Sequence, residues 1–485
     1  MQTAFALAQL ADPDIATANT ILRKCVHCGF CTATCPTFVT LGDERDSPRG
    51  RIYLIKEMLE HGRPANAHVA RHIDRCLSCL ACMTTCPSGV NYMHLVDHAR
   101  AHIEATYRRP LRDRLLRRLL GVLMPNPHLF RWTMVLARFA KPLARLLPDV
   151  SSDVGGATFG RRLRAMLEAV PASVPPPSPV DRPQTFAAEG PRRRRVALMP
   201  GCGQQVLAPE VNEATVRLLT RHGIEVVIAK GSGCCGSSVL HVGRREKARE
   251  LARENIASWI DDLEGPLDAV IANASGCGTT LKDYGHLLAE DPQWKTGAAR
   301  VAELARDVSE VLAPPDLRPA GRPVRADGTP LVIAYHAACS MQHGQKLTEP
   351  PKALLRAAGF AVKDVPEGHL CCGWAGTYQI LQPDLSRTLR NRKVANIARL
   401  KPDVVAAGNF GCIGQIGGGT AIPVAHTVEL LDWVTGGPQP PALEGRGFGL
   451  SVMPSTSGVP STSVIPSAAR DLGPPLRLGP SLRSG

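Results

Sequence analysis

Short apolar runs alternate with amphipathic segments in the middle of the chain. The runs Val196–Met199, Glu225–Ala229 and Ala269–Ala272 have the length and composition of buried parallel strands. Between them, Glu210–His222 and Arg244–Trp259 carry apolar residues at helical spacing. Strands that alternate with helices predict an α/β layer, in which the loops after the strands gather beyond one edge of the sheet.

This pattern occurs twice, and each copy carries four cysteines. They are Cys202, Cys234, Cys235 and Cys277 in the first copy, and Cys339, Cys371, Cys372 and Cys412 in the second. The first three positions are offset by 137 residues (339 − 202) and the last by 135 (412 − 277). We therefore predict an internal duplication of one α/β unit, called the CCG domain after its Cys-Cys-Gly triplet.

Cysteine-rich and cysteine-free segments divide the chain into five parts. They are a ferredoxin-type domain (1–106), a basic helical segment with a Pro-rich linker (107–193), the first CCG domain (194–322), the second CCG domain (323–436) and a tail (437–485). The tail is dominated by Pro, Ser, Gly and Arg, which predicts disorder. The predicted fold class is α+β multidomain, with a helical two-[4Fe-4S] ferredoxin module, a helical linker and a duplicated α/β CCG region.

The first domain contains two matching cysteine runs. They are Cys25-x2-Cys28-x2-Cys31-x3-Cys35-Pro36 and Cys76-x2-Cys79-x2-Cys82-x3-Cys86-Pro87. This is the spacing of bacterial two-cluster ferredoxins, in which the fourth cysteine of each run binds the other cluster. One [4Fe-4S] cluster is thus predicted on Cys25, Cys28, Cys31 and Cys86, and a second on Cys76, Cys79, Cys82 and Cys35. The alternatives, two zinc knots or unrelated thiols, do not account for two complete runs.

The CCG cysteines allow several chemistries. Adjacent cysteines cannot easily form a relaxed disulfide with each other, and the glycine after them permits unusual backbone angles. Each set of four thiolates suits further iron–sulfur or zinc, or a redox-active dithiol; buried structural thiols are the remaining alternative. His336, His343 and His369 lie near the second set, and we interpret them as hydrogen-bonded structural residues rather than ligands or proton donors. No catalytic residue is assigned.

Composition favours metal over disulfides for the 16 cysteines of this 485-residue chain. Residues 1–20 contain Asp12 and Asp14 but no Lys or Arg, so no secretory signal is predicted. No apolar run approaches the roughly 18 residues of a membrane-spanning helix. We therefore expect a cytoplasmic, reducing compartment, where grouped cysteines more often bind metal.

The formal net charge of +14 is partly concentrated in the segment Tyr107–Leu147, whose only acid is Asp113. Its cations are Arg108, Arg109, Arg112, Arg114, Arg117, Arg118, Arg131, Arg138, Lys141 and Arg145. Leu111, Leu115, Leu116, Leu119, Leu120 and Leu123 are predicted to share one helical face. The segment is either an amphipathic surface in peripheral contact with anionic membrane or a set of helices packed on the ferredoxin module. Nucleic-acid binding is disfavoured because stacking aromatics are sparse here.

Several strings carry a resemblance to a known family. They are CVHCGFCTATCPTF, SPRGRIYLIKEML, CLSCLACMTTCPSGV, ASGCGTTLKDYGHLL, QHGQKL and HLCCGWAGTYQILQPDLS. Over roughly residues 15–436 the chain resembles the iron–sulfur subunits of bacterial glycolate oxidase (glycolate dehydrogenase). The wider group includes the anaerobic glycerol-3-phosphate dehydrogenase C subunit and heterodisulfide reductase subunits.

The resemblance implies an electron carrier that does not bind the substrate itself. In that family, flavoprotein subunits carrying FAD oxidise the 2-hydroxy acid, and the iron–sulfur subunit relays electrons towards a membrane quinone. Such a subunit is cytoplasmic or peripheral on the cytoplasmic face of the inner membrane. The absence of a G-x-G-x-x-G after the strand before Cys202 agrees with a flavin held by a partner.

Three alternatives to the glycolate assignment remain open from the sequence. They are an electron-transfer subunit of a related glycerol-3-phosphate or lactate dehydrogenase, a thiol–disulfide (heterodisulfide-type) reductase subunit, and a non-enzymatic iron–sulfur sensor. In heterodisulfide reductases the full CCG pattern ends in Cys-x-x-Cys. Here Thr280 and Gln415 occupy the last position, which counts against disulfide reduction.

Overall fold

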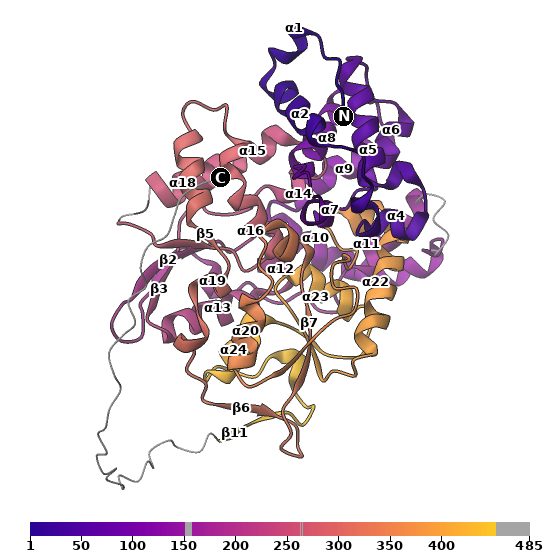
Figure 1. The fold of residues 1–485 in the computed structure, drawn as a ribbon. Coiled ribbons are helices and arrows are strands. Elements are labelled where there is room, and N and C mark those ends of the chain that lie inside the picture. The colour runs from indigo at the N-terminus through magenta and orange to yellow at the C-terminus, as the bar shows by residue number, and fades with distance from the viewer. Residues whose placement is uncertain (151–157, 262, 264, 453–485) are drawn as a thin grey trace, which may run out of the picture.

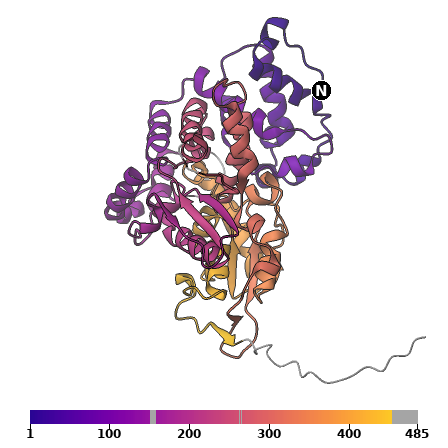
Figure 2. The ribbon, with the colours of Figure 1, turned by 90° about the vertical axis from the view of Figure 1, so that its left-hand side faces the viewer.

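The chain forms one helical unit and two α/β units (Figure 1). A computed structural model describes residues 1–150, 158–261, 263 and 265–452. In two perpendicular views, the indigo N-terminal helices lie above the α/β units (Figure 2). The Tyr378 hydroxyl donates to the Arg75 carbonyl over 3.1 Å, and His94 Nε2 lies 2.7 Å from Asp283 Oδ1. The ferredoxin-type domain is therefore in contact with both CCG domains.

The ferredoxin-type domain is built from short helices around two cysteine loops. Its elements are α1 (Leu7–Leu10), α2 (Pro13–Lys24), α3 (Phe30–Ala33), α4 (Pro36–Leu41), η1 (Glu44–Asp46), α5 (Pro48–Glu60), α6 (Ala67–Asp74), α7 (Ala81–Thr85) and α8 (Tyr92–Thr106). Proline begins α2, α4 and α5, where a missing N–H costs no helical hydrogen bond. Leu22, Ile55 and Leu95 from the longer helices are fully buried. They belong to one apolar core with Cys25, Cys76 and Cys82, which fixes both loops.

The first CCG domain contains a five-stranded sheet in the order β1-β3-β2-β4-β5. The strands are β1 (Gln184–Phe186), β2 (Arg194–Leu198), β3 (Ile224–Ile228), β4 (Ala269–Ile271) and β5 (Ala305–Arg306). The helices are α12 (Gln204–Leu207), α13 (Pro209–Arg221), α14 (Ser237–Leu240), α15 (Arg245–Ile256), η4 (Ala257–Asp261), α16 (Ser275–Lys282), α17 (Tyr284–Leu287), α18 (Lys295–Leu304), α19 (Val308–Val311) and η5 (Pro314–Asp316). All pairs except β1–β3 are parallel. The three predicted strands and two predicted helices are confirmed, with shifted ends.

The second CCG domain repeats this arrangement with a parallel sheet in the order β10-β9-β7-β8. Its strands are β7 (Val332–His336), β8 (Ala361–Asp364), β9 (Val404–Ala407) and β10 (Val424–His426), and its helices are η6 (Ser340–Gly344), α20 (Pro350–Ala357), α21 (Tyr378–Leu381), α22 (Pro383–Ala398), α23 (Phe410–Gly417) and α24 (Thr427–Val434). Val226 and Ile271 of the first copy share one buried core with Ile333 and Val404 of the second. The two copies therefore support each other.

Two edges of the CCG region differ from the sequence prediction. Strand β1 lies within the stretch expected to be linker, after η3 (Pro179–Asp181), and pairs antiparallel with β3. At the other end, η7 (Pro441–Leu443) and β11 (Gly449–Val452) lie within the tail expected to be disordered, and β11 pairs with β6 (Gly321–Val324). Backbone hydrogen bonds hold a strand at the edge of a sheet even when its side chains do not alternate between apolar and polar. The sequence of these two strands therefore does not predict them. Residues 453–485 of that tail lie outside the described residues.

The basic segment forms α9 (Leu111–Leu123), α10 (Pro127–Ala140) and η2 (Lys141–Leu146), followed by α11 (Phe159–Glu168). The expected single leucine face of α9 is wrong, because its leucines divide between two surroundings. Leu116 and Leu120 pack with Val242 and Leu381, whereas Leu111, Leu115 and Leu119 are exposed. Within the described part of the chain, no helix has the length and hydropathy needed to cross a bilayer.

Candidate functional site: cysteine centres

The structure brings the eight cysteines of the ferredoxin-type domain together around two recesses. Cys25, Cys28, Cys31 and Cys86 line the first recess. Cys35, Cys76 and Cys79 line the second. Cys82 lines both, so the two recesses share a wall. Each recess thus combines three cysteines of one run with the last cysteine of the other, as the crossed ligation scheme requires.

Both cysteine loops contain left-handed backbone at matching positions. In the first loop, φ is +55° at His27 and +88° at Gly29; in the second, it is +51° at Ser78 and +63° at Leu80. Left-handed backbone at a residue other than glycine costs of order 1–3 kcal/mol and persists where the surroundings impose it. The tight loops turn successive thiols towards one recess. The chain therefore has the cradle and the donor set that a [4Fe-4S] cluster needs.

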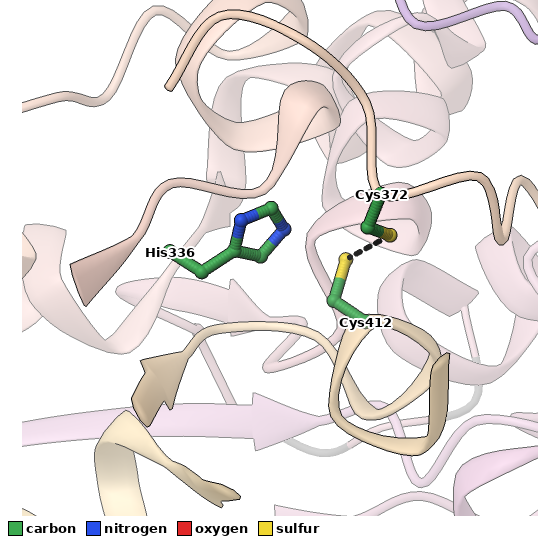
Figure 3. Close-up of side chains that lie close together, drawn as sticks. All are labelled: His336, Cys372 and Cys412. Atoms are coloured by element: carbon green, nitrogen blue, oxygen red, sulfur yellow. Dashed lines mark hydrogen bonds between the residues drawn. The ribbon is translucent and has the colours of Figure 1, made fainter. Parts of the chain in front are cut away.

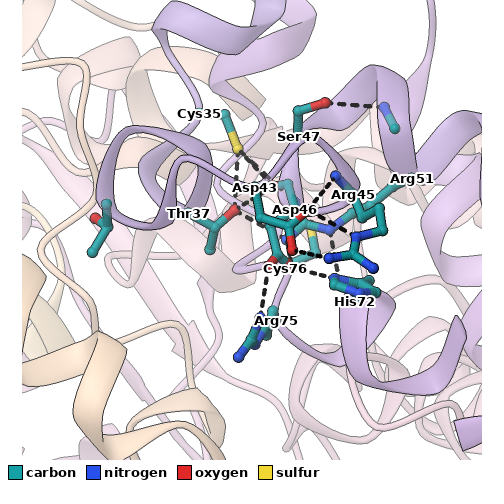
Figure 4. A network of polar contacts seen from close by, with 12 residues as sticks. Cys35, Thr37, Asp43, Arg45, Asp46, Ser47, Arg51, His72, Arg75 and Cys76 are labelled. Carbon is teal, nitrogen blue, oxygen red and sulfur yellow. Dashed lines mark hydrogen bonds and ion pairs between the residues drawn. The ribbon is translucent and has the colours of Figure 1, made fainter. Parts of the chain in front are cut away.

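A buried polar network supports the second recess (Figure 4). The Asp46 carboxylate accepts from His72 Nδ1 over 2.9 Å and from Arg75 Nη1 over 2.7 Å. Arg51 Nη2 lies 3.4 Å from the same carboxylate and donates to Thr37 Oγ1 over 3.0 Å. Asp46 is fully buried and Arg51 is 1% exposed, so their charges are shielded from water. The network therefore places two guanidinium groups beside one carboxylate in this interior.

Arg51 also touches the second recess directly. Its Nη1 lies 3.9 Å from Cys35 Sγ. Burial lowers the pKa of Arg51, but the negative charges of Cys76, Tyr92, Cys35 and Asp46 outweigh burial and raise it above its ordinary value. Arg51 was not among the residues predicted from the sequence. The signal was an arginine on the same face of α5 as Ile55 and Met58, a face that is otherwise apolar.

The cysteines of each CCG domain also lie together. In the second domain, Cys339 Sγ is 3.7 Å from Cys371 Sγ, and Cys372 Sγ is 3.5 Å from Cys412 Sγ (Figure 3). In the first domain, hydrogen bonds from Cys202 and Cys235 lower the pKa of Cys234 well below its ordinary value. The convergence of three loops in each copy, predicted from the strand pattern, is present.

The glycine of each triplet has a specific steric reason. Gly236 has φ +89° and Gly373 has φ +95°. A Cβ at Gly373 would lie 2.5 Å from the Ser386 carbonyl oxygen, and one at Gly236 would lie 3.1 Å from that of Ala248. In both copies the glycine N–H donates to the first thiol of the triplet over 3.4 Å. The glycine therefore lets the backbone approach the thiols.

The two residues that replace a fifth cysteine have structural partners. Gln415 Nε2 lies 3.3 Å from the Cys372 carbonyl oxygen and 2.9 Å from Ser386 Oγ. Thr280 Oγ1 donates to the Gly276 carbonyl over 3.2 Å. Gln415 therefore ties α23 to the Cys-Cys-Gly loop, whereas Thr280 bonds within α16, and neither adds a sulfur ligand. Each CCG site is thus limited to four thiolates, unlike the reductase pattern.

The histidines near the second set fall into two classes. His343 is hydrogen-bonded, with Nδ1 2.7 Å from Thr84 Oγ1 and Nε2 3.1 Å from the His369 carbonyl oxygen, so its predicted structural role is confirmed. The hydrogen bonds expected of His336 are absent. This side chain is 1% exposed, and neither of its ring nitrogens has a hydrogen-bond partner among the described residues. Burial lowers the pKa of His336 to about 3.

The second CCG site is adjacent to the second recess of the ferredoxin-type domain. Cys79 belongs to one buried cluster with Cys371, Cys372 and Cys412. Burial raises the pKa of Cys79, and the charge of Cys339 raises it further. The three sites are therefore arranged as a series, with the second recess between the first recess and the second CCG site.

Comparison with known proteins bears on these centres. The family model of the 4Fe-4S dicluster domain matches residues 21–90, and that of the Cysteine-rich domain matches residues 196–282 and 333–417. The chain is 40% identical over 415 residues to the glycolate oxidase iron-sulfur subunit of Escherichia coli (strain K12), covering 86% of this chain and 94% of that protein. It is 29% identical over 248 residues to lactate utilization protein A of Geobacillus thermodenitrificans (strain NG80-2), covering 49% of this chain and 98% of that protein.

Proposed function

The chain belongs to the family of glycolate oxidase iron–sulfur subunits, and we propose that it carries electrons from an FAD-containing flavoprotein subunit towards a membrane quinone. It acts as the electron-transfer subunit of an oxidoreductase complex and does not bind the 2-hydroxy acid itself. The donor is the flavoprotein, the acceptor is the quinone, and two [4Fe-4S] clusters carry the electron between them.

The shared wall between the two recesses carries the proposal. A bound [4Fe-4S] cluster accepts and releases one electron, at a potential set by nearby charge and hydrogen bonds. Cys25, Cys28, Cys31 and Cys86 would hold one cluster, and Cys76, Cys79, Cys82 and Cys35 the other. Because Cys82 borders both recesses, the electron has only a short distance to cover inside the protein.

The surface beside the first recess suits a redox partner. Cys28 is exposed there, and its neighbours Val26 and Phe30 are 67% and 63% exposed. Exposed apolar side chains beside a buried centre are typical of protein docking surfaces. We therefore place the flavoprotein contact at this edge, with the second recess further inside.

Replacing Cys28 by serine tests the relay. In the purified complex, Cys28→Ser should leave flavin reduction by glycolate intact and should abolish quinone reduction, because one ligand of the outer cluster is lost. Ser88→Ala is the matched control, since Ser88 lines the same recess but lies outside the ligand set. Normal quinone reduction by Cys28→Ser would contradict the relay.

The basic segment supports a second part of the proposal, which is peripheral contact with an anionic membrane. Helix α9 exposes Leu111, Leu115, Leu119 and Val122, and α10 with η2 exposes Leu129, Trp132, Leu136, Phe139, Leu143 and Leu146. Each set follows helical spacing and forms one stripe. The exposed cations of this segment are Arg108, Arg112, Arg114, Arg118, Arg138 and Arg145. Apolar stripes flanked by cations favour an anionic lipid surface over water.

The opposite side of α9 explains why this segment remains attached to the protein. Asp74 accepts from Arg109 Nη1 over 2.6 Å and from Arg117 Nη2 over 2.9 Å. Leu116 and Leu120 are buried on the same side. The two alternatives left open by the sequence therefore apply to different faces of one helix: one face is packed, and we propose that the other meets the membrane on the cytoplasmic side.

Vesicle binding tests this contact. The double variant Trp132→Ser/Phe139→Ser should bind vesicles of phosphatidylcholine and phosphatidylserine at least about tenfold more weakly, since each side chain contributes of order 1 kcal/mol or more when buried. Leu7→Ser is the control, because Leu7 is 87% exposed but lies on α1. Equal binding of all three proteins would contradict the membrane contact, and failure of the double variant to join the flavoprotein complex would assign this face to a protein partner.

A further inference from the structure

The hydroxyl of Tyr92 lies inside the ferredoxin-type domain without a hydrogen-bond partner among the described residues. Tyr92 is 3% exposed, so water does not compensate for the missing bond. A buried tyrosine O–H normally has a partner, because an unpaired polar group loses its hydration. The other three buried tyrosines, Tyr284, Tyr335 and Tyr378, each donate to a protein atom. The hydroxyl of Tyr92 therefore requires a partner that the described protein atoms do not supply.

Packing explains the ring of Tyr92 but not its hydroxyl. Tyr92 begins α8 and shares the buried face of that helix with Leu95 and Ala99. These side chains belong to the apolar core that also contains Cys76 and Cys82. A phenylalanine would fill nearly the same space without burying an unpaired O–H group. The hydroxyl therefore serves a purpose other than the packing of α8.

Tyr92 stands in the wall between the two cysteine recesses. It lines the first recess beside Cys86 and the second recess beside Cys76. Pro48 and Cys82 also border both recesses. Because Pro48 has no polar side-chain atom and Cys82 is a proposed ligand, Tyr92 supplies the hydrogen-bond donor of this wall.

The charges around the hydroxyl place it on the side of the second recess. Burial raises the pKa of Tyr92, and the negative charges of Cys76 and Cys82 raise it further, whereas Arg51 and Arg100 act in the opposite direction. Arg51 lines the second recess. Arg100 Nη2 donates to the Cys76 carbonyl over 2.7 Å, so Arg100 belongs to the same cysteine loop. The ring thus borders both recesses, while the hydroxyl is surrounded by groups of the second.

A cluster in the second recess would offer the acceptor that Tyr92 lacks. The sulfur atoms of a [4Fe-4S] cluster and of its thiolate ligands accept hydrogen bonds, and such bonds help to set the reduction potential. Reduction adds a negative charge to the acceptor, and a hydrogen bond to a charged acceptor is stronger than one to a neutral acceptor. A donor at this position therefore stabilises the reduced state more than the oxidised state.

We propose that the Tyr92 hydroxyl donates an O–H···S hydrogen bond to the cluster in the second recess, which is the inner cluster of the relay. This bond raises the reduction potential of the inner cluster and leaves that of the outer cluster, in the first recess, nearly unchanged. Electrons that enter at the outer cluster are therefore drawn inwards. The inference rests on the proposed function for the presence of the two clusters, and it adds a residue that favours one direction of transfer between them.

An EPR-monitored redox titration of the full-length, anaerobically purified chain tests this inference. Tyr92→Phe removes one oxygen atom and keeps the ring, so the core around α8 should stay folded and the iron content unchanged. The equilibrium constant for reduction of the inner cluster should fall about tenfold, which is about 59 mV for one electron. That of the outer cluster should change less than about twofold. Cys28→Ser assigns the two signals, because it removes a proposed ligand of the outer cluster alone.

Pulsed EPR of protein whose clusters are assembled in D₂O gives a second measurement. Wild type should show an exchangeable deuteron coupled to the reduced inner cluster that is lost in Tyr92→Phe. Tyr53→Phe is the matched control, since it removes the same atom from a side chain of α5 that is 51% exposed. It should change neither the two potentials nor the deuteron couplings.

Three results would each overturn the inference. They are an inner-cluster potential that is unchanged or higher in Tyr92→Phe, equal shifts of both clusters, and deuteron couplings that are the same in Tyr92→Phe and wild type. The proposed function fails in a different way, through missing clusters or through a flavoprotein that does not reduce them. Because the potentials are measured on the chain alone, a failure of glycolate oxidation or of quinone reduction does not alter them.

Discussion

Replacing Arg51 by methionine should lower the reduction potential of the cluster that we propose on Cys35, Cys76, Cys79 and Cys82. Arg51 Nη1 lies 3.9 Å from Cys35 Sγ, inside a region closed to water. Reduction adds a negative charge to the cluster, and the guanidinium stabilises that charge. Without Arg51 the reduced state is less stable, so its potential becomes more negative.

The size of the shift follows from Coulomb's law. Two unit charges about 4 Å apart interact by about 4 kcal/mol at an effective dielectric constant of about 20. The added electron is spread over the cluster and its ligands, so we take about half, or about 2 kcal/mol. For a one-electron couple this corresponds to about 85 mV, since about 59 mV equals a tenfold change.

An EPR-monitored redox titration measures this shift. Arg51→Lys keeps the charge and should change the potential by less than about 30 mV, although the lysine cannot reproduce every hydrogen bond of the guanidinium. Arg45→Met removes an exposed arginine that is paired with Asp43, and screening by water should leave the potential nearly unchanged. A shift below about 20 mV in Arg51→Met, or a shift to higher potential, would refute the reasoning.

Three further substitutions test the packing of a CCG loop, the attachment of α9 and the docking surface. Gly373→Ala should destabilise the protein by about 3 kcal/mol or more in denaturant unfolding, because the new Cβ meets the Ser386 carbonyl oxygen. Gly376→Ala is the control, since Gly376 has φ +61° but no atom within 4 Å of its Cβ position, and it should cost only about 1 kcal/mol. Equal costs for the two variants would exclude the steric explanation. Asp74→Asn should cost about 3 kcal/mol at pH 7 and expose α9 to protease. Burial alone would raise the pKa of Asp74, but the charges of Arg117 and Arg109 have the larger effect and lower this pKa below its ordinary value. The difference from wild type should therefore persist above about pH 4 and shrink below it; a difference that grows on acidification would contradict this. Phe30→Ser should slow electron transfer from the flavoprotein mainly at low partner concentration, and unchanged kinetics would place the docking surface elsewhere.

Much of the fold could be predicted because the sequence repeats its own pattern. The apolar run at Val196 and the cysteine spacing recur in the second copy, so each element was supported twice. The cysteines follow buried parallel strands, whose carboxyl ends lie at the same edge of the sheet. This arrangement brings the thiols together even if the loop conformations are not known. The ferredoxin runs were equally informative because their spacing fixes which thiols can reach one recess.

The features that the sequence did not reveal depend on contacts between distant parts of the chain. Arg51 occupies an ordinary position on an amphipathic helix, and only the packing of η1 and α6 surrounds it with Asp46 and His72. His336 ends a strand, and the loops after two other strands bring Cys372 and Cys412 to it. The edge strands β1 and β11 have no apolar period, and only pairing with β3 and β6 orders them.

Rapid-freeze EPR of the purified complex tests the central claim most directly. The complex of this chain with its flavoprotein subunits is mixed anaerobically with glycolate, and cluster reduction is followed over single turnovers. We expect two [4Fe-4S] clusters, accounting for about eight irons per chain, to be reduced as fast as the complex reduces quinone. Clusters that stay oxidised while the flavin is reduced and quinone turnover continues would contradict the account.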